Sequence, residues 1–569
     1  MQTEIGYNNK KVQIHLGKMT IVDEFYTTFE EIEIDFGKRY TLWIHPKKSI
    51  SLQKVICTIP LKINKQLDNL FCNGFQSWSE SKILSFDEKI KTLRWFAQSL
   101  MGYYGDYHFK KFVKRKKGFL HSWSYTYLRK YNSDLIKFFG SLNEQNGFTL
   151  FTADSKNNLL SIKKNIENVQ LEHSFCLLDF IVLHGDEKRV FEIYSTELGF
   201  KLPIKPVATG WTSWYNYYNN ISENIILKNL NNLVEKEIPI DFFQIDDGWQ
   251  THVGDWLSVK NTFPNGMQTI SDVIHQKNIK AGLWLAPFIA ESNSTLFKIH
   301  PDWFLRNENH KLLAVGYSAM WSGKFYALDI YNEAVRAYLT AVFYNVLTRW
   351  NFDMVKLDFL YAVCVLPRPN KSRGQVMHDA LTFIRDLCGN KIILGCGTPL
   401  ASGFGIFDYC RIGADIHLQW EHKLLKFLRN RERVSTIVAL RTTISRWSLN
   451  NVGFLNDPDV FILRKKNQNL TTTQQRTILI VNALLGNLLF ISDDISEYDA
   501  ETFTQYKEIF ILKDRIVQSV TPLKKDIYKI HYSVLDKKYD CFINLTDSNQ
   551  FIENINLLPF QSEIRILFN

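Results

Sequence analysis

The sequence lacks the cysteine spacing of a metal site or a disulfide scaffold. Its eight cysteines are scattered along 569 residues, and none belongs to a C-x-x-C pair. Structural zinc sites and disulfide frameworks usually show closely spaced cysteines. We therefore expect reduced thiols in a cytoplasmic protein without a bound metal, and no motif indicates a cofactor.

Long hydrophobic runs are also missing. The first ten residues contain no apolar segment of the kind that forms a secretory signal. The most apolar stretch, residues 478–491, is too short to span a bilayer and is interrupted by Asn482 and Asn487. We predict that this stretch forms a buried helix and strand, and we expect no membrane partner.

Acidic residues are in the minority, with 58 Asp and Glu against 68 Lys and Arg, which gives a formal charge of +10. Excess positive charge can indicate nucleic-acid binding. The densest basic cluster, residues 110–117, is short, and such runs are more often solvated turns. We expect no nucleic-acid partner, and filter binding at physiological salt would test that alternative.

The chain is too long for one hydrophobic core, so more than one domain is expected. Residues 1–200 alternate apolar and polar positions, which predicts an N-terminal antiparallel β-sandwich. The segment around Pro203 and Pro206 is predicted to be a linker. Short strand patterns return in residues 500–569, which predicts a small C-terminal β domain.

Between these segments, residues 207–495 alternate buried strands with amphipathic helices. The predicted strands are 242–245, 281–285, 354–357, 392–395, 409–412 and 488–491, and the clearest helices are 222–237, 333–350 and 375–388. An open doubly wound sheet is expected to carry an early glycine-rich phosphate loop, and none is present. The alternation therefore favours a catalytic (β/α)8 TIM barrel.

Carboxylates stand at two of the predicted strand ends. Lys356 and Asp358 end one strand, and Asp415 follows Arg411 at the end of another. Two carboxylates on separate strand ends of one barrel suit glycosidic bond cleavage, since one can attack the sugar while the other protonates the leaving oxygen. Lys356 lies two residues before Asp358, so both side chains face one side and the ammonium favours an ionised carboxylate.

Either aspartate alone could be a strand-end cap or part of a structural ion pair. Polar and aromatic residues, however, cluster at several successive strand ends. The clusters are Gly-Trp-x-Ser-Trp-Tyr (210–215), Ile-Asp-Asp-Gly-Trp-Gln (245–250), Gly-Leu-Trp-Leu-Ala-Pro (282–287), Lys-Leu-Asp-Phe-Leu (356–360), Leu-Gly-Cys-Gly (394–397), Arg-Ile-Gly-x-Asp (411–415) and Asn-Asp-Pro-Asp (456–459).

In this order the motifs resemble those of glycoside hydrolase family 36, the α-galactosidases, in its shorter bacterial branch. The resemblance covers the barrel region. The segment Asn-Gly-Phe-Gln-Ser-Trp-Ser (73–79) is similar to the loop with which that family's β domain reaches over the active site.

The resemblance implies a retaining, exo-acting α-galactosidase that releases terminal α-D-galactosyl residues from melibiose- or raffinose-type oligosaccharides through a covalent galactosyl-enzyme. It implies that Asp358 is the nucleophile and Asp415 the general acid/base. The implied substrate-binding residues are Asp246 and Asp247 at the 4- and 6-hydroxyls, Lys356 at the 3- and 4-hydroxyls, Cys396 and Arg411 near the 2-hydroxyl, and Trp78, Trp211 and Trp284 around the pocket.

The chain also departs from the family pattern. Larger tetrameric members carry Lys-Trp-Asp and Cys-Ser-Gly-Gly-Gly where this chain has Lys-Leu-Asp (356–358) and Gly-Cys-Gly-Thr-Pro (395–399). The oligomeric state and the preferred aglycone are therefore left open, as is a structural or substrate-binding role for residues 456–459.

Three alternatives to this function remain. The first is an α-N-acetylgalactosaminidase or a galactosyl transferase on the same scaffold, although Cys396 near the 2-hydroxyl would crowd an N-acetyl group. The second is a catalytically inactive sugar-binding protein, against which the intact Asp358 and Asp415 argue. The third is the nucleic-acid binder considered above.

Overall fold

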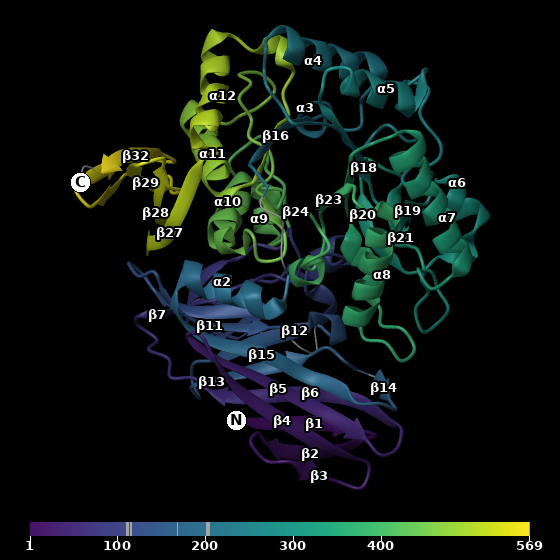
Figure 1. Cartoon of the computed structure of the whole chain (residues 1–569), viewed down its shortest axis with the longest axis vertical. Coiled ribbons are helices and arrows are strands. Elements are labelled where there is room, and N and C mark those ends of the chain that lie inside the picture. The colour runs from purple at the N-terminus through teal and green to yellow at the C-terminus, as the bar shows by residue number, and fades with distance from the viewer. Residues whose placement is uncertain (110–112, 114–115, 168, 201–204, 568–569) are drawn as a thin grey trace.

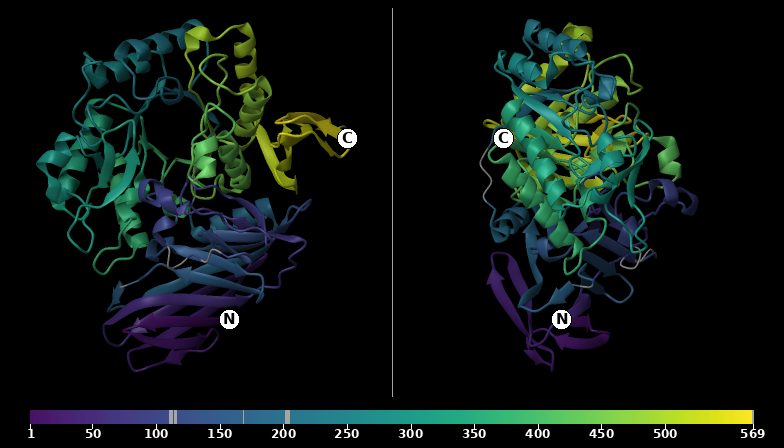
Figure 2. Two further views of the ribbon diagram at one scale, coloured as in Figure 1. Left: turned by 180° about the vertical axis from the view of Figure 1, so that it is seen from behind. Right: turned by 90° about the vertical axis from the view of Figure 1, so that its right-hand side faces the viewer.

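The computed structural model describes residues 1–109, 113, 116–167, 169–200 and 205–567. The N-terminal strands form one end of the molecule, and the mixed helices and strands of the middle segment lie above them (Figure 1). The C-terminal strands lie to one side of the middle segment in the view of Figure 1 and in the view from behind in Figure 2. Most of the predicted basic cluster, at 110–112 and 114–115, and the predicted linker residue Pro203 lie outside the described residues.

The N-terminal segment contains two antiparallel sheets whose apolar faces enclose a common core. One sheet has the order β2-β1-β6-β13-β12-β9, with β14 also paired to β6, and the other has the order β3-β4-β5-β15-β11-β10-β7-β8. Burial alternates along β6, where Ile50, Leu52, Val55, Cys57 and Ile59 are buried, as expected for a strand with one face on a core. This arrangement confirms the predicted sandwich.

The bounds of these strands are β1 (Gln2–Tyr7), β2 (Lys10–His15), β3 (Thr20–Ile21), β4 (Phe25–Ile34), β5 (Gly37–Pro46), β6 (Ile50–Pro60), β7 (Asp68–Cys72), β8 (Lys82–Ser85), β9 (Phe119–Trp123), β10 (Tyr125–Lys130), β11 (Leu135–Ser141), β12 (Thr149–Asp154), β13 (Leu159–Lys164), β14 (Val169–Leu171) and β15 (Phe175–Asp186). Helix α1 (Gln98–Met101) lies between β8 and β9, and α2 (Glu187–Leu198) follows β15.

Eight parallel strands form the predicted barrel, in the order β25-β24-β23-β22-β18-β17-β16-β26. They are β16 (Ala208–Thr212), β17 (Phe242–Ile245), β18 (Lys280–Leu285), β22 (Met354–Leu357), β23 (Ile392–Gly395), β24 (Tyr409–Arg411), β25 (Leu455–Asp457) and β26 (Leu488–Ile491). A parallel bridge between Phe461 and Ile491 joins the two ends of the sheet just beyond β25. The (β/α)8 architecture is therefore confirmed.

Helices alternate with the barrel strands along the chain. They are α3 (Trp214–Tyr217), α4 (Glu223–Glu235), α5 (Gly266–His275), α6 (Thr295–Ile299), α7 (Glu333–Tyr344), α8 (Arg373–Cys388), α9 (Lys423–Phe427), α10 (Thr436–Ser445), α11 (Thr472–Leu485) and α12 (Ala500–Leu512). Capping boxes formed by Ser372 with Gln375 and by Thr471 with Gln474 set the first turns of α8 and α11. Among the described residues, no helix is long and apolar enough to cross a membrane.

A small antiparallel sheet interrupts the barrel between β18 and α7. It has the order β19-β21-β20, formed by β19 (Ile289–Glu291), β20 (Ala314–Ser318) and β21 (Gly323–Ala327). The Glu291 carboxylate accepts hydrogen bonds from the backbone N–H groups of Val253, at 3.0 Å, and Ser322, at 2.6 Å. These bonds hold the turn between β20 and β21 beside the loop that follows β17.

The C-terminal segment differs from its prediction in its first part. Residues 500–512 form helix α12, which packs against α11, and strands begin only at residue 515. The sheet β27-β28-β29-β32 and the pair β30-β31 consist of β27 (Arg515–Lys524), β28 (Ile527–Val534), β29 (Lys537–Asn544), β30 (Gln550–Ile552), β31 (Ile555–Leu557) and β32 (Ser562–Leu567). Helix α12 follows the last barrel strand, so it belongs to the β/α alternation.

Candidate active site

A cavity of about 500 Å³ opens at the carboxyl ends of the barrel strands. Four aspartates, Asp246, Asp247, Asp358 and Asp415, lie in its wall together with the ammonium group of Lys356. Each of these residues comes at or just after the end of a barrel strand. We call this space the active-site cavity, because strand ends at this face carry the reactive groups of TIM-barrel enzymes.

Asp358 follows β22 and is held by two donors. Its Oδ1 accepts the backbone N–H of Phe359 at 2.9 Å, and its Oδ2 accepts the indole N–H of Trp284 at 3.2 Å. Phe359 adopts a left-handed backbone, with φ of 54°, so the chain turns sharply directly after the carboxylate. The two hydrogen bonds therefore hold this buried carboxylate in one orientation.

Lys356 and Asp246 form a buried ion pair beside this carboxylate. The ammonium group donates to Asp246 Oδ2 at 2.8 Å, and the same oxygen accepts from Gln244 at 2.7 Å. Burial alone would lower the pKa of Lys356, but the attraction of Asp246 outweighs it and the pKa is raised. Lys356 therefore stays cationic and contributes positive charge next to Asp358.

Asp415 lies on the opposite part of the wall and has a different environment. Its Oδ1 accepts Nη1 of Arg411 at 2.8 Å, while 34% of its side chain remains accessible to solvent. Burial raises the pKa of Asp415, the Arg411 charge lowers it, and the nearby Asp358 charge raises it, so that the net shift is upward.

Arg411 opposes protonation of Asp415 only weakly because its charge is shared. Its Nε donates to Asp457 at 3.0 Å, and its Nη2 forms an ion pair with Asp459 Oδ1 at 2.9 Å. Asp459 also accepts the hydroxyl of Tyr215 and the backbone N–H of Ile416. Three carboxylates around one guanidinium leave it nearly neutralised, which is why burial decides the protonation of Asp415.

Asp247 is a buried carboxylate of this cavity whose pKa is raised although it accepts two hydrogen bonds. Its Oδ1 accepts the side-chain amide of Gln250 at 2.6 Å and its Oδ2 accepts the indole N–H of Trp321 at 2.8 Å. Burial raises the pKa of Asp247 to about 6, although both hydrogen bonds act in the other direction. The carboxylate is therefore ionised at neutral pH, but at an electrostatic cost.

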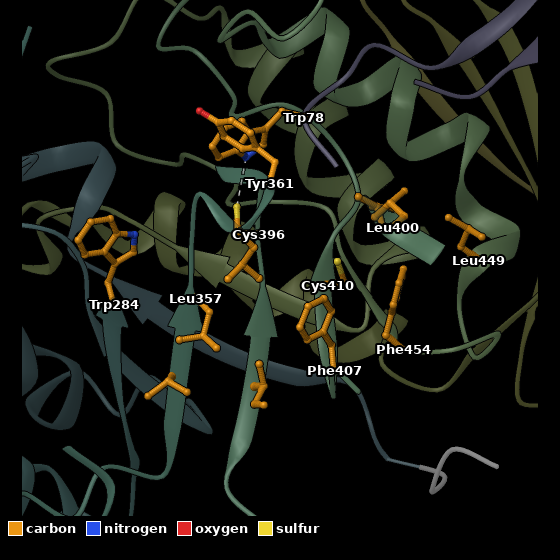
Figure 3. Packing of buried hydrophobic residues seen from close by; sticks show 14 of the residues in the cluster. Trp78, Trp284, Leu357, Tyr361, Cys396, Leu400, Phe407, Cys410, Leu449 and Phe454 are labelled. Atoms are coloured by element: carbon orange, nitrogen blue, oxygen red, sulfur yellow. Dashed lines mark hydrogen bonds between the residues drawn. The ribbon is translucent and has the colours of Figure 1, made fainter. Parts of the chain in front are cut away.

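Trp78, from the N-terminal segment, closes one side of the active-site cavity. Its indole N–H points to the sulfur of Cys396 at 3.2 Å, and a dashed line marks this contact in Figure 3. A Cβ at Gly397, where φ is +59°, would approach the Trp78 ring and the Phe359 nitrogen to 2.9 Å. Glycine at this position is thus required both by the backbone conformation and by the close approach of Trp78.

A buried arginine attaches the loop of Trp78 to the barrel. Arg446 donates to the side chain of Asn73 at 2.9 Å, to the carbonyl of Ser77 at 2.7 Å and to the carbonyl of Ile412 at 2.7 Å. Ile412 immediately follows β24, so one guanidinium joins the N-terminal loop to the strand that leads to Asp415. The loop position is therefore set by the barrel.

Seven of the ten residues predicted for the site line the active-site cavity, and three do not. The seven are Trp78, Asp246, Asp247, Trp284, Lys356, Asp358 and Asp415. Cys396 lies beneath Trp78, and Arg411 reaches the cavity only through Asp415.

The third, Trp211, is a correction to the sequence-based assignment. Thr212 on β16 bonds to Asp246 and faces the barrel interior, so the preceding side chain points to the outer face. Trp211 is fully buried there, stacked on Phe243 at 4.4 Å, with its indole N–H bonded to the carbonyl of Asp493.

Several contributors to the site were not found from the sequence. Trp321 lies in the turn of an inserted hairpin, and Glu432 lies in a loop after β24, far from any strand-end motif. Asp457 and Asp459 form ion pairs with Arg411. Two of the four residues at 456–459 therefore have a structural role. Of these residues, Asp457 and Asp459 alone belong to a motif that the sequence shows, the polar cluster at the end of β25.

The family model of Melibiase matches residues 199–387 of this chain. Alpha-galactosidase 2 of Pediococcus pentosaceus is 25% identical over 229 residues, covering 37% of this chain and 30% of that protein. Alpha-galactosidase Mel36A of Lactobacillus acidophilus is 27% identical over 205 residues, covering 34% and 26%. The matched segment thus spans less than a third of the length of these two relatives.

Solved structures resemble the whole chain. The α-galactosidase TtGalA from Thermus thermophilus, in complex with p-nitrophenyl α-D-galactopyranoside, has a TM-score of 0.72 at 24% identity, covering 93% of this chain and 98% of that one. The GH36 α-galactosidase AgaA from Geobacillus stearothermophilus has a TM-score of 0.66 at 14% identity, covering 95% and 80%. At these identities the likeness shows a shared fold.

Proposed function

We propose that the chain belongs to glycoside hydrolase family 36 and that it is a retaining, exo-acting α-galactosidase. Its substrates would be terminal α-D-galactosyl residues of melibiose- or raffinose-type oligosaccharides. The observation that carries the proposal is the pair Asp358 and Asp415 in one cavity, the first oriented by two hydrogen bonds and the second with a raised pKa. Two carboxyl groups whose environments differ in this way suit a nucleophile and a general acid.

In the first step, a carboxylate oxygen of Asp358 attacks the anomeric carbon of the galactoside. The bond from that carbon to the leaving oxygen breaks, and the proton of Asp415 moves to the leaving oxygen. Trp284 and the Phe359 N–H keep the attacking carboxylate oriented, since each binds one of its oxygens. The product is an ester between the sugar and Asp358, with inverted configuration.

In the second step, Asp415 acts as a base. Its carboxylate takes a proton from water, the water oxygen attacks the anomeric carbon, and the bond to Asp358 breaks. Two inversions give net retention. Between the two steps the charge of Arg411 stabilises the Asp415 carboxylate, and sharing with Asp457 and Asp459 keeps this stabilisation small enough for the carboxylate to accept the proton of water.

Recognition of galactose would depend on the group around Asp247. Galactose differs from glucose in its axial 4-hydroxyl, so discrimination requires acceptors aimed in that direction. Asp246 accepts from the side chains of Lys356, Gln244 and Thr212 and from the backbone N–H of Asp247, which limits its free lone pairs. Asp247 also lines the cavity, but it accepts from two donors, Gln250 and Trp321. A desolvated carboxylate left without its sugar hydroxyl costs several kcal/mol, which corresponds to a preference of about 10³-fold or more.

Paired substrates test this proposal. The protein should hydrolyse a nitrophenyl α-galactoside and leave the corresponding α-N-acetylgalactosaminide and α-glucoside nearly untouched. NMR of the first product should show α-galactose. If β-galactose appears first, water attacks the substrate directly and Asp358 is not a nucleophile; hydrolysis of the N-acetylated substrate at a similar rate would favour the alternative specificity.

Location in a reducing compartment, the cytoplasm, is part of the same proposal. All eight cysteines are unpaired and buried. Buried thiols of this kind behave as small apolar side chains and form no disulfide framework. Alkylation of the freshly purified, denatured protein should modify eight thiols without prior reduction, and fewer would count against a reducing compartment.

A further inference from the structure

A second cavity lies where the three parts of the chain meet. It has a volume of about 280 Å³. The loop around β8 contributes Lys82 and Lys89, the loop around α9 contributes Arg429 and Arg431, and the end of β27 contributes Lys524. We call this space the basic cavity.

Positive charge dominates the wall of the basic cavity. Ten lysine and arginine side chains line it, against three carboxylates, those of Glu80, Glu88 and Asp526. The chain as a whole has only a small excess of positive residues, 68 against 58. The local excess is therefore a property of this site, and a concave wall of one sign concentrates the field inside it.

The carboxylates in the wall are already occupied. Glu80 lies between Lys82, at 2.7 Å, and the guanidinium groups of Arg433 and Arg441, each at 3.8 Å. Asp526 accepts both Nε and Nη2 of Arg441, at 2.6 and 2.7 Å. Burial raises the pKa of Glu80, but these three cations lower it further, and the net result is a pKa of about 2. A carboxyl group shifted in this direction despite burial reports a strongly positive surrounding potential.

Other cations of the wall have no acidic partner. Among the described residues, Lys89, Lys91, Arg429 and Lys524 form no ion pair. Arg431 is buried and binds Asp106 through Nη2, yet its Nε has no hydrogen-bond acceptor among the described residues. A buried guanidinium N–H without an acceptor is costly, which indicates that an acceptor from a ligand or solvent completes the site.

We propose that the basic cavity binds a small phosphate-bearing molecule at the junction of the three domains. Guanidinium and ammonium groups are the usual partners of phosphate oxygens. The volume accommodates a phosphate or diphosphate group with a small substituent, and it is too small for a nucleic-acid duplex. Because the wall combines all three parts of the chain, such a ligand would also hold them together.

The basic cavity shares a wall with the active-site cavity. Between residues 425 and 434, Lys426, Arg429 and Arg431 line the basic cavity, while Asn430 and Glu432 line the active-site cavity. The ligand would therefore contact the segment whose other face meets the substrate. A bound anion would order this segment and provide a physical route from a phosphorylated metabolite to the active site.

Binding of inorganic phosphate and pyrophosphate to the full chain tests the proposal. Isothermal titration should detect saturable binding of one pyrophosphate per chain at constant ionic strength. Titration with sodium chloride of equal ionic strength should give no saturable heat. The double substitution Lys89→Glu with Lys524→Glu should weaken the binding about tenfold or more, because it reverses two unpaired charges in the wall.

The matched control is Lys62→Glu with Lys65→Glu. These are exposed lysines outside the basic cavity, and their substitution changes the net charge of the protein by the same amount. The control should bind pyrophosphate with an unchanged dissociation constant. Equal loss of binding in both double variants would mean a non-specific charge effect and would overturn the proposal. The proposal would also be overturned if a folded wild-type chain, with an unchanged melting profile, showed no saturable binding. Neither result bears on galactoside hydrolysis, so the two proposals fail independently.

Discussion

The active-site cavity and the basic cavity use charge in opposite ways although they share a wall. In the active-site cavity, carboxylates predominate, most of them are buried, and each is held by named donors. In the basic cavity, cations predominate, and the unpaired ones, such as Lys89 and Lys524, are exposed. The first arrangement fixes the protonation states and orientations of individual carboxyl groups, whereas the second provides a positive electrostatic potential.

The difference predicts how each cavity responds to substitution. A buried carboxylate with a shifted pKa has a function that no neighbour can take over, so its loss should be severe. Cations that act through a summed potential each supply a small share. A single substitution of a carboxylate in the active-site cavity should therefore reduce function by orders of magnitude more than a single substitution of a cation in the basic cavity.

The largest effect is expected for Asp358→Ala. Removing the attacking carboxylate should lower kcat by more than about 10⁴-fold, because the covalent step is lost. Azide should restore turnover by entering from the vacated side and should give β-galactosyl azide, identified by NMR.

The Lys89→Glu and Lys524→Glu double variant is the comparison for Asp358→Ala. It should retain wild-type hydrolysis in the absence of phosphate. If Asp358→Ala keeps more than about a tenth of the wild-type kcat, the carboxylate at the end of β22 is structural. A variant that also loses its melting transition would be replaced by Asp358→Asn, which preserves the volume and one of the two acceptor positions.

A smaller and substrate-dependent effect is expected for Asp415→Ala. Natural α-galactosides, whose leaving alcohol needs a proton, should be slowed by roughly 10²–10⁴-fold, while nitrophenyl galactosides should be less affected in the first step. Azide should now give the α-azide, because it attacks the galactosyl-enzyme.

The pH profile gives the control for Asp415. Its pKa is raised by burial, so the protonated acid persists above the usual carboxyl range, and kcat/KM should fall as pH rises through that pKa. The alanine variant should lose this alkaline limb. Identical limbs in both proteins would assign the ionisation to another group, and exchanged azide products would mean that the roles of Asp358 and Asp415 are reversed.

The sequence carried enough information for the barrel and for the residues at its strand ends. Strands such as 242–245, 354–357 and 392–395 coincide with β17, β22 and β23, since continuous apolar runs between amphipathic helices have few other solutions. The carboxylates at their ends follow directly, because parallel strands deliver their carboxyl ends to one face.

Residues that depend on long-range packing could not be predicted in this way. Trp321 bonds to Asp247 across 74 positions, and Arg446 joins Asn73 across 373 positions, with no local motif around either. Trp211 failed for a different reason. The family resemblance implies a place for this tryptophan at the pocket, but side chains alternate along β16 and Thr212 occupies the inward position.

The smallest expected effect on turnover is that of Asp247→Asn, and it distinguishes recognition from structural support. The substitution should reduce kcat/KM for α-galactosides by about 10–10²-fold, since one charge-assisted hydrogen bond to the sugar is lost. Stability should respond differently. Burial raises the folded-state pKa of Asp247 to about 6, above the value near 3.8 expected when unfolded. The folded state thus binds the proton more tightly, and its contribution to stability is full below pH about 4 and lost as pH rises through about 6.

The asparagine variant lacks that titration, so the melting temperature of wild type relative to the variant should fall between pH about 4 and about 6 and then level off. Trp321→Phe is the matched control: it removes the donor to Asp247 Oδ2 but keeps the carboxylate and the ring, so turnover should fall less than in the asparagine variant. If Asp247→Asn instead leaves galactoside kinetics intact and lowers the melting temperature at pH 7, Asp247 is a structural cap. The contrast between the two cavities would then apply to Asp358 and Asp415 alone, because Asp247 would owe its burial to packing and not to substrate recognition.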